Sequence, residues 1–166
     1  MPIKATFMLT LFAATQCWSQ SPSLHVPEEI RHCLTASGLR QKFEVIGALN
    51  PFYLRGDFDG DGSVEPAILI KNRSSSKEGI LVCLQDGSAA KVLGASTQFH
   101  LASGSVDDLK FEDWEVRTEL RAVPKPTAEE DWLLKSRSDK ILLIWRGASG
   151  LVYWRGNQFR YYVVDE

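Results

Sequence analysis

The segment DFDGDGSVE places three aspartates on alternate residues and a glutamate four positions after the last of them. Carboxylates packed this closely repel one another, so a compact turn that contains them needs a cation. Calcium takes about six to eight oxygen ligands, and loops of the D-x-D-x-D-G type supply them from alternate side chains, one carbonyl and a later acid. The segment therefore predicts a calcium site with these ligands: Asp57, Asp59, Asp61, the Ser63 carbonyl and Glu65.

The flanks of this segment differ from those of a helix-loop-helix calcium hand. The last loop position holds Ile68 instead of a bidentate glutamate, and Phe52–Leu54 and Ala67–Ile70 have the composition of strands. The pattern D-x-D-G-D-G-x-x-E therefore resembles the calcium loops of FG-GAP and integrin-type β-propeller repeats, in which such a loop links two strands. The resemblance implies a structural calcium ion. The alternative is an acidic, glycine-rich turn that binds nothing.

The usual catalytic constellations are absent from the sequence. The three histidines, His25, His32 and His100, have no zinc-type spacing, and the chain contains no H-E-x-x-H, C-x-x-C or G-x-S-x-G motif. The acids between Asp107 and Glu115 could in principle form an acid/base pair, but they cluster in one polar stretch that favours a solvated loop. We therefore expect a non-catalytic protein. A cell-envelope hydrolase that uses these acids is the less favoured alternative.

A second motif lies near the C-terminus, where the sequence SGLVY fits S-G-x-x-Y and is followed by WRGNQF. These residues resemble the signature hairpin of bacterial periplasmic lysozyme inhibitors. Together with the calcium loop, they are similar to immunity proteins that protect bacteria from peptidoglycan hydrolases. The resemblance implies an exported, non-catalytic inhibitor of a lysozyme-like peptidoglycan hydrolase.

In that family the signature loop enters the hydrolase cleft, which contains two carboxylic residues. The resemblance assigns hydrogen bonds with these acids to Ser149 and Tyr153, a sharp bend to Gly150, and charge-assisted bonds to Arg155. An alternative is that Tyr153 packs inward from a core strand. The alternative function is a calcium-stabilised adhesion or envelope-assembly module related to FG-GAP repeats.

The N-terminus predicts export to the periplasm or the medium. Residues 1–19 have the pattern of a signal peptide, with Lys4 before an apolar run and a cleavage site near Ser19. We expect a disordered lead-in over 20–26 and a single β-rich domain over 27–166. The formal net charge of the whole chain, −2, does not suit a nucleic-acid binder, and no segment suits a membrane span. After cleavage, Cys33 and Cys83 remain as a possible disulfide or as two buried thiols.

The expected fold is mainly β, an antiparallel sandwich or a barrel or propeller-like sheet with one N-terminal helix. The helix begins at Pro27, buries Ile30, Cys33 and Leu34, and ends at Gly38. We expect an exposed loop over 103–113 and a short helical turn capped by Thr127. The predicted strands are Phe43–Ile46, Phe52–Arg55, Pro66–Lys71, Gly79–Leu84, Ala90–Leu93, Trp114–Leu120, Lys140–Trp145, Leu151–Trp154 and Gln158–Val163.

Overall fold

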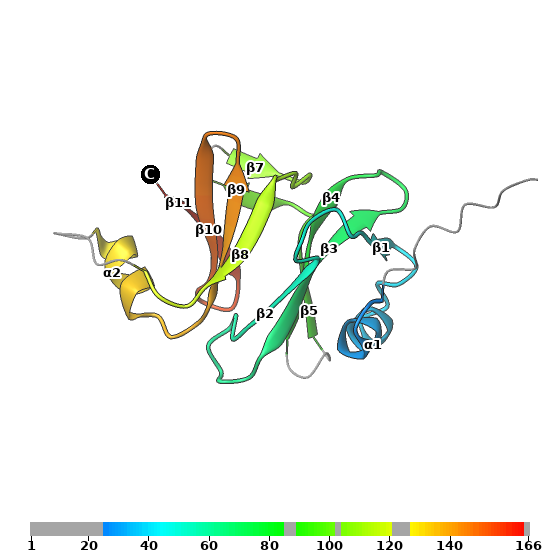
Figure 1. The fold of residues 1–166 in the computed structure, drawn as a ribbon, viewed down its shortest axis with the longest axis horizontal. Coiled ribbons are helices and arrows are strands. Elements are labelled where there is room, and N and C mark those ends of the chain that lie inside the picture. The colour runs from blue at the N-terminus through cyan, green and yellow to red at the C-terminus, as the bar shows by residue number, and fades with distance from the viewer. Residues whose placement is uncertain (1–24, 85–88, 102–103, 121–126, 165–166) are drawn as a thin grey trace, which may run out of the picture.

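A computed structural model describes residues 25–84, 89–101, 104–120 and 127–164. The predicted signal peptide and most of the predicted lead-in lie outside these residues. Figure 1 shows the described elements. In chain order they are α1 (Glu28–Ala36), β1 (Phe43–Val45), β2 (Tyr53–Gly56), β3 (Glu65–Asn72), β4 (Glu78–Leu84), β5 (Ala89–Gly94), β6 (Phe99–Leu101), β7 (Gly104–Val106), β8 (Asp113–Arg117), α2 (Ala128–Lys135), β9 (Lys140–Trp145), β10 (Ala148–Trp154) and β11 (Phe159–Val164).

Most strands belong to two antiparallel sheets. The N-terminal sheet has the order β1-β3-β4-β5, and β2 also pairs with β3. The C-terminal sheet has the order β11-β10-β9-β8, and β6 and β7 form a separate small hairpin. The mainly β, antiparallel class predicted from the sequence is therefore confirmed.

The main core lies between the two sheets, which sit beside each other in Figure 1. Ile80 and Val82 of β4 contribute one side of this core, and Leu143 of β9 and Val152 of β10 contribute the other. Side chains alternate between the faces of a strand, so each sheet turns every second apolar residue toward this core. The arrangement is that of a β-sandwich.

Helix α1 covers the opposite face of the N-terminal sheet. Ile30 and Cys33 of the helix pack with Ile68 and Leu81 of the sheet in a second buried cluster. A disulfide joins Cys33 to Cys83 of β4, with 6.0 Å between their Cα atoms and a sequence separation of 50 residues. The predicted bridge is thus present. It fastens α1 to the sheet and stabilises the protein by about 4 kcal/mol in the chain-entropy model.

Three parts of the chain differ from the sequence-based expectations. The stretch 103–113, predicted as an exposed loop, contains the strand β7. The three residues of β7 pair with the three residues of β6. Strands this short carry too little periodicity to be recognised. The turn capped by Thr127 extends into the full helix α2, with the Thr127 and Glu130 capping box in place. Val26, from the predicted disordered lead-in, packs against the cluster beneath α1.

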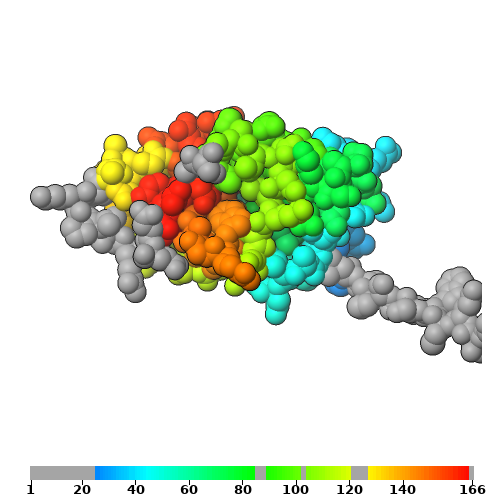
Figure 2. Space-filling view, turned by 90° about the horizontal axis from the view of Figure 1, so that it is seen from above, coloured from blue at the N-terminus to red at the C-terminus, as the bar shows by residue number. Residues whose placement is uncertain are grey.

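The two helices lie far apart on the sandwich. Figure 2 shows α2 at one end of the long axis, in yellow, and the N-terminal elements at the other end, in blue and cyan. Among the described residues, neither helix has the length and apolar character needed to span a bilayer.

Candidate metal centre and adjoining clefts

The acidic segment connects β2 to β3. The two strands pair up to Gly56 and Glu65, so the residues between them form the connection of an antiparallel hairpin. A strand–loop–strand setting is what the flanking sequence predicted. Four predicted ligands come together here, with one oxygen of each carboxylate within 4.8 Å of the others: Asp57, Asp59, Asp61 and Glu65.

Backbone N–H groups of the loop orient the three aspartates. The two carboxylate oxygens of Asp57 accept hydrogen bonds from Gly60 (2.7 Å) and Gly62 (3.0 Å), and Asp59 accepts one from Asp61 (3.1 Å). Gly60 and Gly62 have φ values of 82° and 93°, which side-chain-bearing residues adopt at a cost. The glycines therefore let the chain curl so that the acids converge. Ser63, the predicted carbonyl ligand, lies exposed in the same loop.

Glu65 is the innermost member of the cluster. It is only 2% exposed, and its Oε2 accepts a hydrogen bond from the Phe58 N–H at 2.8 Å. Its Oε1 is buried and has no hydrogen-bond partner. Burial, with a smaller contribution from the neighbouring aspartates, raises the pKa of Glu65 from 4.5 to about 7. A buried carboxylate oxygen without a partner is costly, and a cation beside it removes that cost.

The loop is attached to the other sheet as well as to its own. The N–H of Asp57 donates to Oδ2 of Asp139 at 2.9 Å, and the N–H of Asp139 donates to the carbonyl of Asp57 at 2.6 Å. Gly56 allows this close approach, because a Cβ there would lie 2.9 Å from Asp139 Oδ2 and 2.9 Å from the Phe58 ring. The candidate metal centre therefore lies where the two sheets meet.

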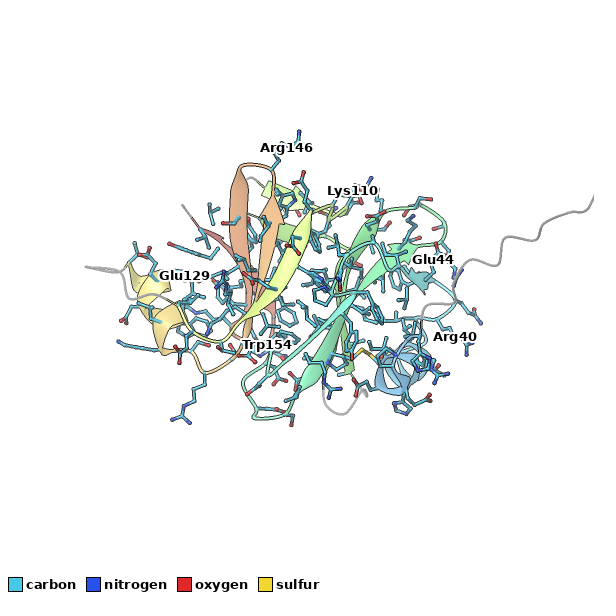
Figure 3. All side chains as sticks on the ribbon, viewed as in Figure 1. Arg40, Glu44, Lys110, Glu129, Arg146 and Trp154 are labelled. Atoms are coloured by element: carbon cyan, nitrogen blue, oxygen red, sulfur yellow. A yellow bond between two sulfur atoms is a disulfide. The ribbon has the colours of Figure 1, made fainter. Side chains whose placement is uncertain are left out.

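Two clefts adjoin the acidic loop. The larger, of about 460 Å³, lies between the loop, α2 and the end of β10, and the smaller, of about 370 Å³, extends toward β5. Asp59, Gly60 and Trp154 line both clefts. Trp154, labelled in Figure 3, thus forms the wall between two hollows that border the acidic cluster.

The S-G-x-x-Y motif does not form an exposed loop, so the solvent-exposed position predicted for Ser149 and Tyr153 is wrong. Ser149 is 3% exposed and Tyr153 is 2% exposed. Both belong to β10, which pairs with β9 on one side and β11 on the other. The alternative interpretation, a core strand with Tyr153 packed inward, is confirmed.

Gly150 does not form the predicted sharp bend. It makes room for the packing of a neighbouring side chain. A Cβ at this position would lie 2.0 Å from the hydroxyl oxygen of Tyr161, so the tyrosine of β11 covers the glycine. The strand continues through Gly150 because this cross-strand contact replaces the missing side chain. A turn of the predicted kind would require the chain to leave the sheet at Gly150. The turn instead lies three residues earlier, at Gly147, whose φ is 75° and which directly precedes β10.

The hydroxyl of Tyr153 and the guanidinium of Arg155 both contact Glu129 of α2. The Tyr162 hydroxyl donates to Glu130 at 2.6 Å. Figure 3 shows Glu129 on α2 beside the C-terminal sheet. Residues predicted to bind a partner protein therefore hold α2 against the sheet.

The acids considered for catalysis have structural partners. Asp107 pairs with Lys77 at 2.6 Å, and Asp108 accepts the N–H of Glu78 at 2.7 Å. The three histidines are exposed: His25 lies just before α1, His32 on α1 and His100 on β6. These contacts hold the segment after β7 against β4.

Two residues near the candidate metal centre, Asp139 and Lys140, were not identified from the sequence. Asp139 attaches the loop to the second sheet, and no local pattern marks it, because its partner is 82 residues away. Lys140 is 1% exposed and donates to the Ser136 carbonyl at 3.0 Å; burial lowers its pKa. Alternation of side chains along β9 places Lys140 on the face of the strand that points into the core, so the strand pattern in the sequence could have indicated its burial.

Comparison of the chain with protein-family models, with curated proteins and with solved structures found no significant match.

Proposed function

We propose that this protein is a non-catalytic, calcium-binding adhesion or assembly module of the cell envelope. One observation carries the calcium-binding part of the proposal: Glu65, which converges with three aspartates, is buried and has a carboxylate oxygen without a hydrogen-bond partner. Exposed acidic turns are common without an ion, but a buried oxygen without a partner is a rare feature that calls for a specific explanation.

The donor set favours calcium over other metals. All four candidate side-chain ligands are carboxylates, and neither histidine nor cysteine belongs to the cluster. Zinc and copper prefer nitrogen or sulfur donors, whereas calcium accepts many carboxylate and carbonyl oxygens in flexible geometry. Magnesium demands a strict octahedron and retains several waters. Asp57, Asp59, Asp61 and Glu65 would hold the ion, and the Ser63 carbonyl is a further candidate ligand.

The ion would act by stabilising the joint between the two sheets. Its ligands lie on the loop that Asp139 fastens to the C-terminal sheet. Neutralising the clustered acids would remove their mutual repulsion and order this joint. The Cys33–Cys83 bridge supports a periplasmic or secreted location, because disulfides persist in oxidising compartments. Extracellular calcium modules need dissociation constants of only about 10⁻⁴ to 10⁻³ M.

Inhibition of a lysozyme-like hydrolase stays a prediction from the sequence resemblance. The buried positions of Ser149 and Tyr153 remove the contacts on which that prediction depended. Arg146 lies at the tip between β9 and β10, and its side chain is 93% exposed. An inhibitor of this kind would have to contact the acids of the hydrolase cleft through Arg146 instead. Muramidase assays with the wild type and Arg146→Ala test this second candidate. Unchanged muramidase activity in the presence of the wild type would reject it.

Isothermal titration of the metal-free protein with calcium tests the calcium site on which the proposed function depends. We expect one calcium ion per chain, and loss of binding in Asp59→Asn. Glu119→Gln is the matched control, because Glu119 is an exposed acid outside the cluster. Absence of calcium binding by the wild type would contradict the proposal.

A further inference from the structure

We propose that the larger cleft beside the acidic loop binds a neutral oligosaccharide, with sugar hydroxyls completing the coordination of the calcium ion. This inference rests on the proposed calcium site and adds a ligand class to it. The volume of about 460 Å³ lies within the range of roughly 300–1,000 Å³ that small-molecule sites occupy.

The acidic loop cannot saturate a calcium ion by itself if each predicted ligand supplies one oxygen. Four carboxylates and one carbonyl provide about five of the six to eight oxygens that calcium takes. Glu65 closes the inner side of the cluster, and Asp59 lines the larger cleft. Open coordination positions would therefore face the cleft, where adjacent hydroxyl groups of a sugar can occupy them.

The cleft wall combines aromatic rings with polar groups. Trp154 and Trp132 line it, and the Arg155 guanidinium lies 5.0 Å from the centre of the Trp132 ring. The C–H face of a pyranose is apolar and packs well on such surfaces. Its hydroxyls both donate and accept hydrogen bonds, which suits a wall that contains the acceptor Asp131 and the donor Arg137.

The charge balance favours a neutral ligand. Lys135 pairs with Asp131 at 2.7 Å, and Arg155 pairs with Glu129. Among the described residues, only Arg137 of the cleft-lining cations is left without an ionic partner. The four acids of the loop also outnumber the two charges of a calcium ion. No surplus of positive charge is available to attract an acidic polymer.

The backbone of the cleft disfavours an extended peptide. Peptides commonly bind by adding a strand to an open sheet edge. The strand that reaches the larger cleft is β10, which pairs with β11 as far as Trp154 and with β9 as far as Val152, so at most Tyr153 and Trp154 offer an open edge. Helix α2 and two loops provide the remaining wall. The cleft therefore recognises its ligand through side chains and the ion.

Titration with a panel of soluble trisaccharides tests the proposal. The probes are mannotriose, cellotriose and chitotriose, with trigalacturonate as the acidic comparison, each followed by calorimetry and tryptophan fluorescence. We expect a neutral trisaccharide to bind in calcium and not in chelator. Arg137→Ala should weaken this binding about tenfold through loss of a charged hydrogen bond. Arg160→Ala is the matched control, because Arg160 is exposed on β11 outside the cleft.

The outcomes separate this inference from the calcium site. Calcium binding without binding of any neutral trisaccharide would overturn the saccharide proposal and leave the metal site in place. Failure of calcium itself to bind would overturn both proposals. Equal saccharide binding in chelator would reject coordination through the ion. Tighter binding of trigalacturonate than of every neutral probe would reject the neutral ligand. Because Arg137 is exposed, its substitution should leave the fold intact and keep the test informative.

Discussion

Asp57 and Asp139 exchange two hydrogen bonds across the junction of the two sheets. The N–H of Asp57 donates to Asp139 Oδ2 at 2.9 Å, and the N–H of Asp139 donates to the Asp57 carbonyl at 2.6 Å. Asp57 is also a candidate calcium ligand. Metal binding at the candidate site would therefore share one residue with the docking of the two sheets, so a change in either should affect the other.

Removal of the Asp139 carboxylate should weaken this junction. Asp139→Ala leaves the N–H of Asp57 without its acceptor, and we expect a loss of about 1–3 kcal/mol in the free energy of unfolding. Urea denaturation measures this loss. Asp131→Ala is the control, because it removes an exposed i,i+4 pair with Lys135 that contributes about 0.3–0.5 kcal/mol. Equal effects of the two substitutions would show that Asp139 has no special role.

Calcium and protons should compete for Glu65. Its pKa is raised from 4.5 to about 7 in the metal-free fold, so between these values the folded state holds a proton that the unfolded state has released. The stability of the metal-free protein should therefore fall as the pH rises from 4.5 to 7. Calcium affinity should rise over the same interval, because the deprotonated carboxylate is the ligand.

Thermal unfolding in chelator across this pH range checks the proton linkage, with Glu65→Gln as the comparison. The variant should lose most of the pH dependence, because its side chain does not titrate. A wild-type melting temperature that rises from pH 4.5 to 7 in chelator would contradict the sign derived for Glu65.

The contact between Gly150 and Tyr161 should make β10 intolerant of a side chain. Gly150→Ala places a methyl group where the tyrosine ring lies, and overpacking of this kind costs about 1–3 kcal/mol. Tyr161→Ala should relieve the conflict, so the double variant should lose less stability than the sum of the single variants. Chemical denaturation of all four proteins gives this coupling energy. Strict additivity would mean that the ring does not cover the glycine.

The disulfide should account for a large part of the stability of the N-terminal sheet. Replacing Cys33 and Cys83 by alanine opens the loop of 50 residues, and we expect a loss of about 4 kcal/mol. Denaturation of the oxidised protein and the double variant measures the difference. If calcium holds the sheets at a separate junction, the calcium affinity of the double variant should be unchanged under conditions where it remains folded.

Local sequence patterns predicted the features that depend on neighbouring residues. The convergence of Asp57, Asp59 and Asp61 follows from their spacing around two glycines, and the strand on either side follows from β-branched and aromatic composition. The cap of α2 was visible in Thr127 and Glu130. These features are encoded within a few residues, so a single sequence suffices to predict them.

Features that depend on distant partners were beyond a single sequence. Ser149 and Gly150 have turn-like composition, yet Tyr161 covers the glycine and keeps both residues in a central strand. The hydroxyl of Tyr153 was expected in solvent, but Glu129 of α2 accepts its hydrogen bond. Tertiary contacts overrode local preference in both cases, and this is common for strands.

The most direct test of the calcium centre is the melting temperature of the wild type in chelator and in about 10 mM calcium. With a dissociation constant of about 10⁻⁴ M, the ion should stabilise the fold by about 2.7 kcal/mol. This stabilisation corresponds to a rise of roughly 5–10 °C for a domain of this size. Asp59→Asn should abolish the rise. Coincident melting curves of the wild type with and without calcium would contradict the presence of an ion at the junction of the two sheets.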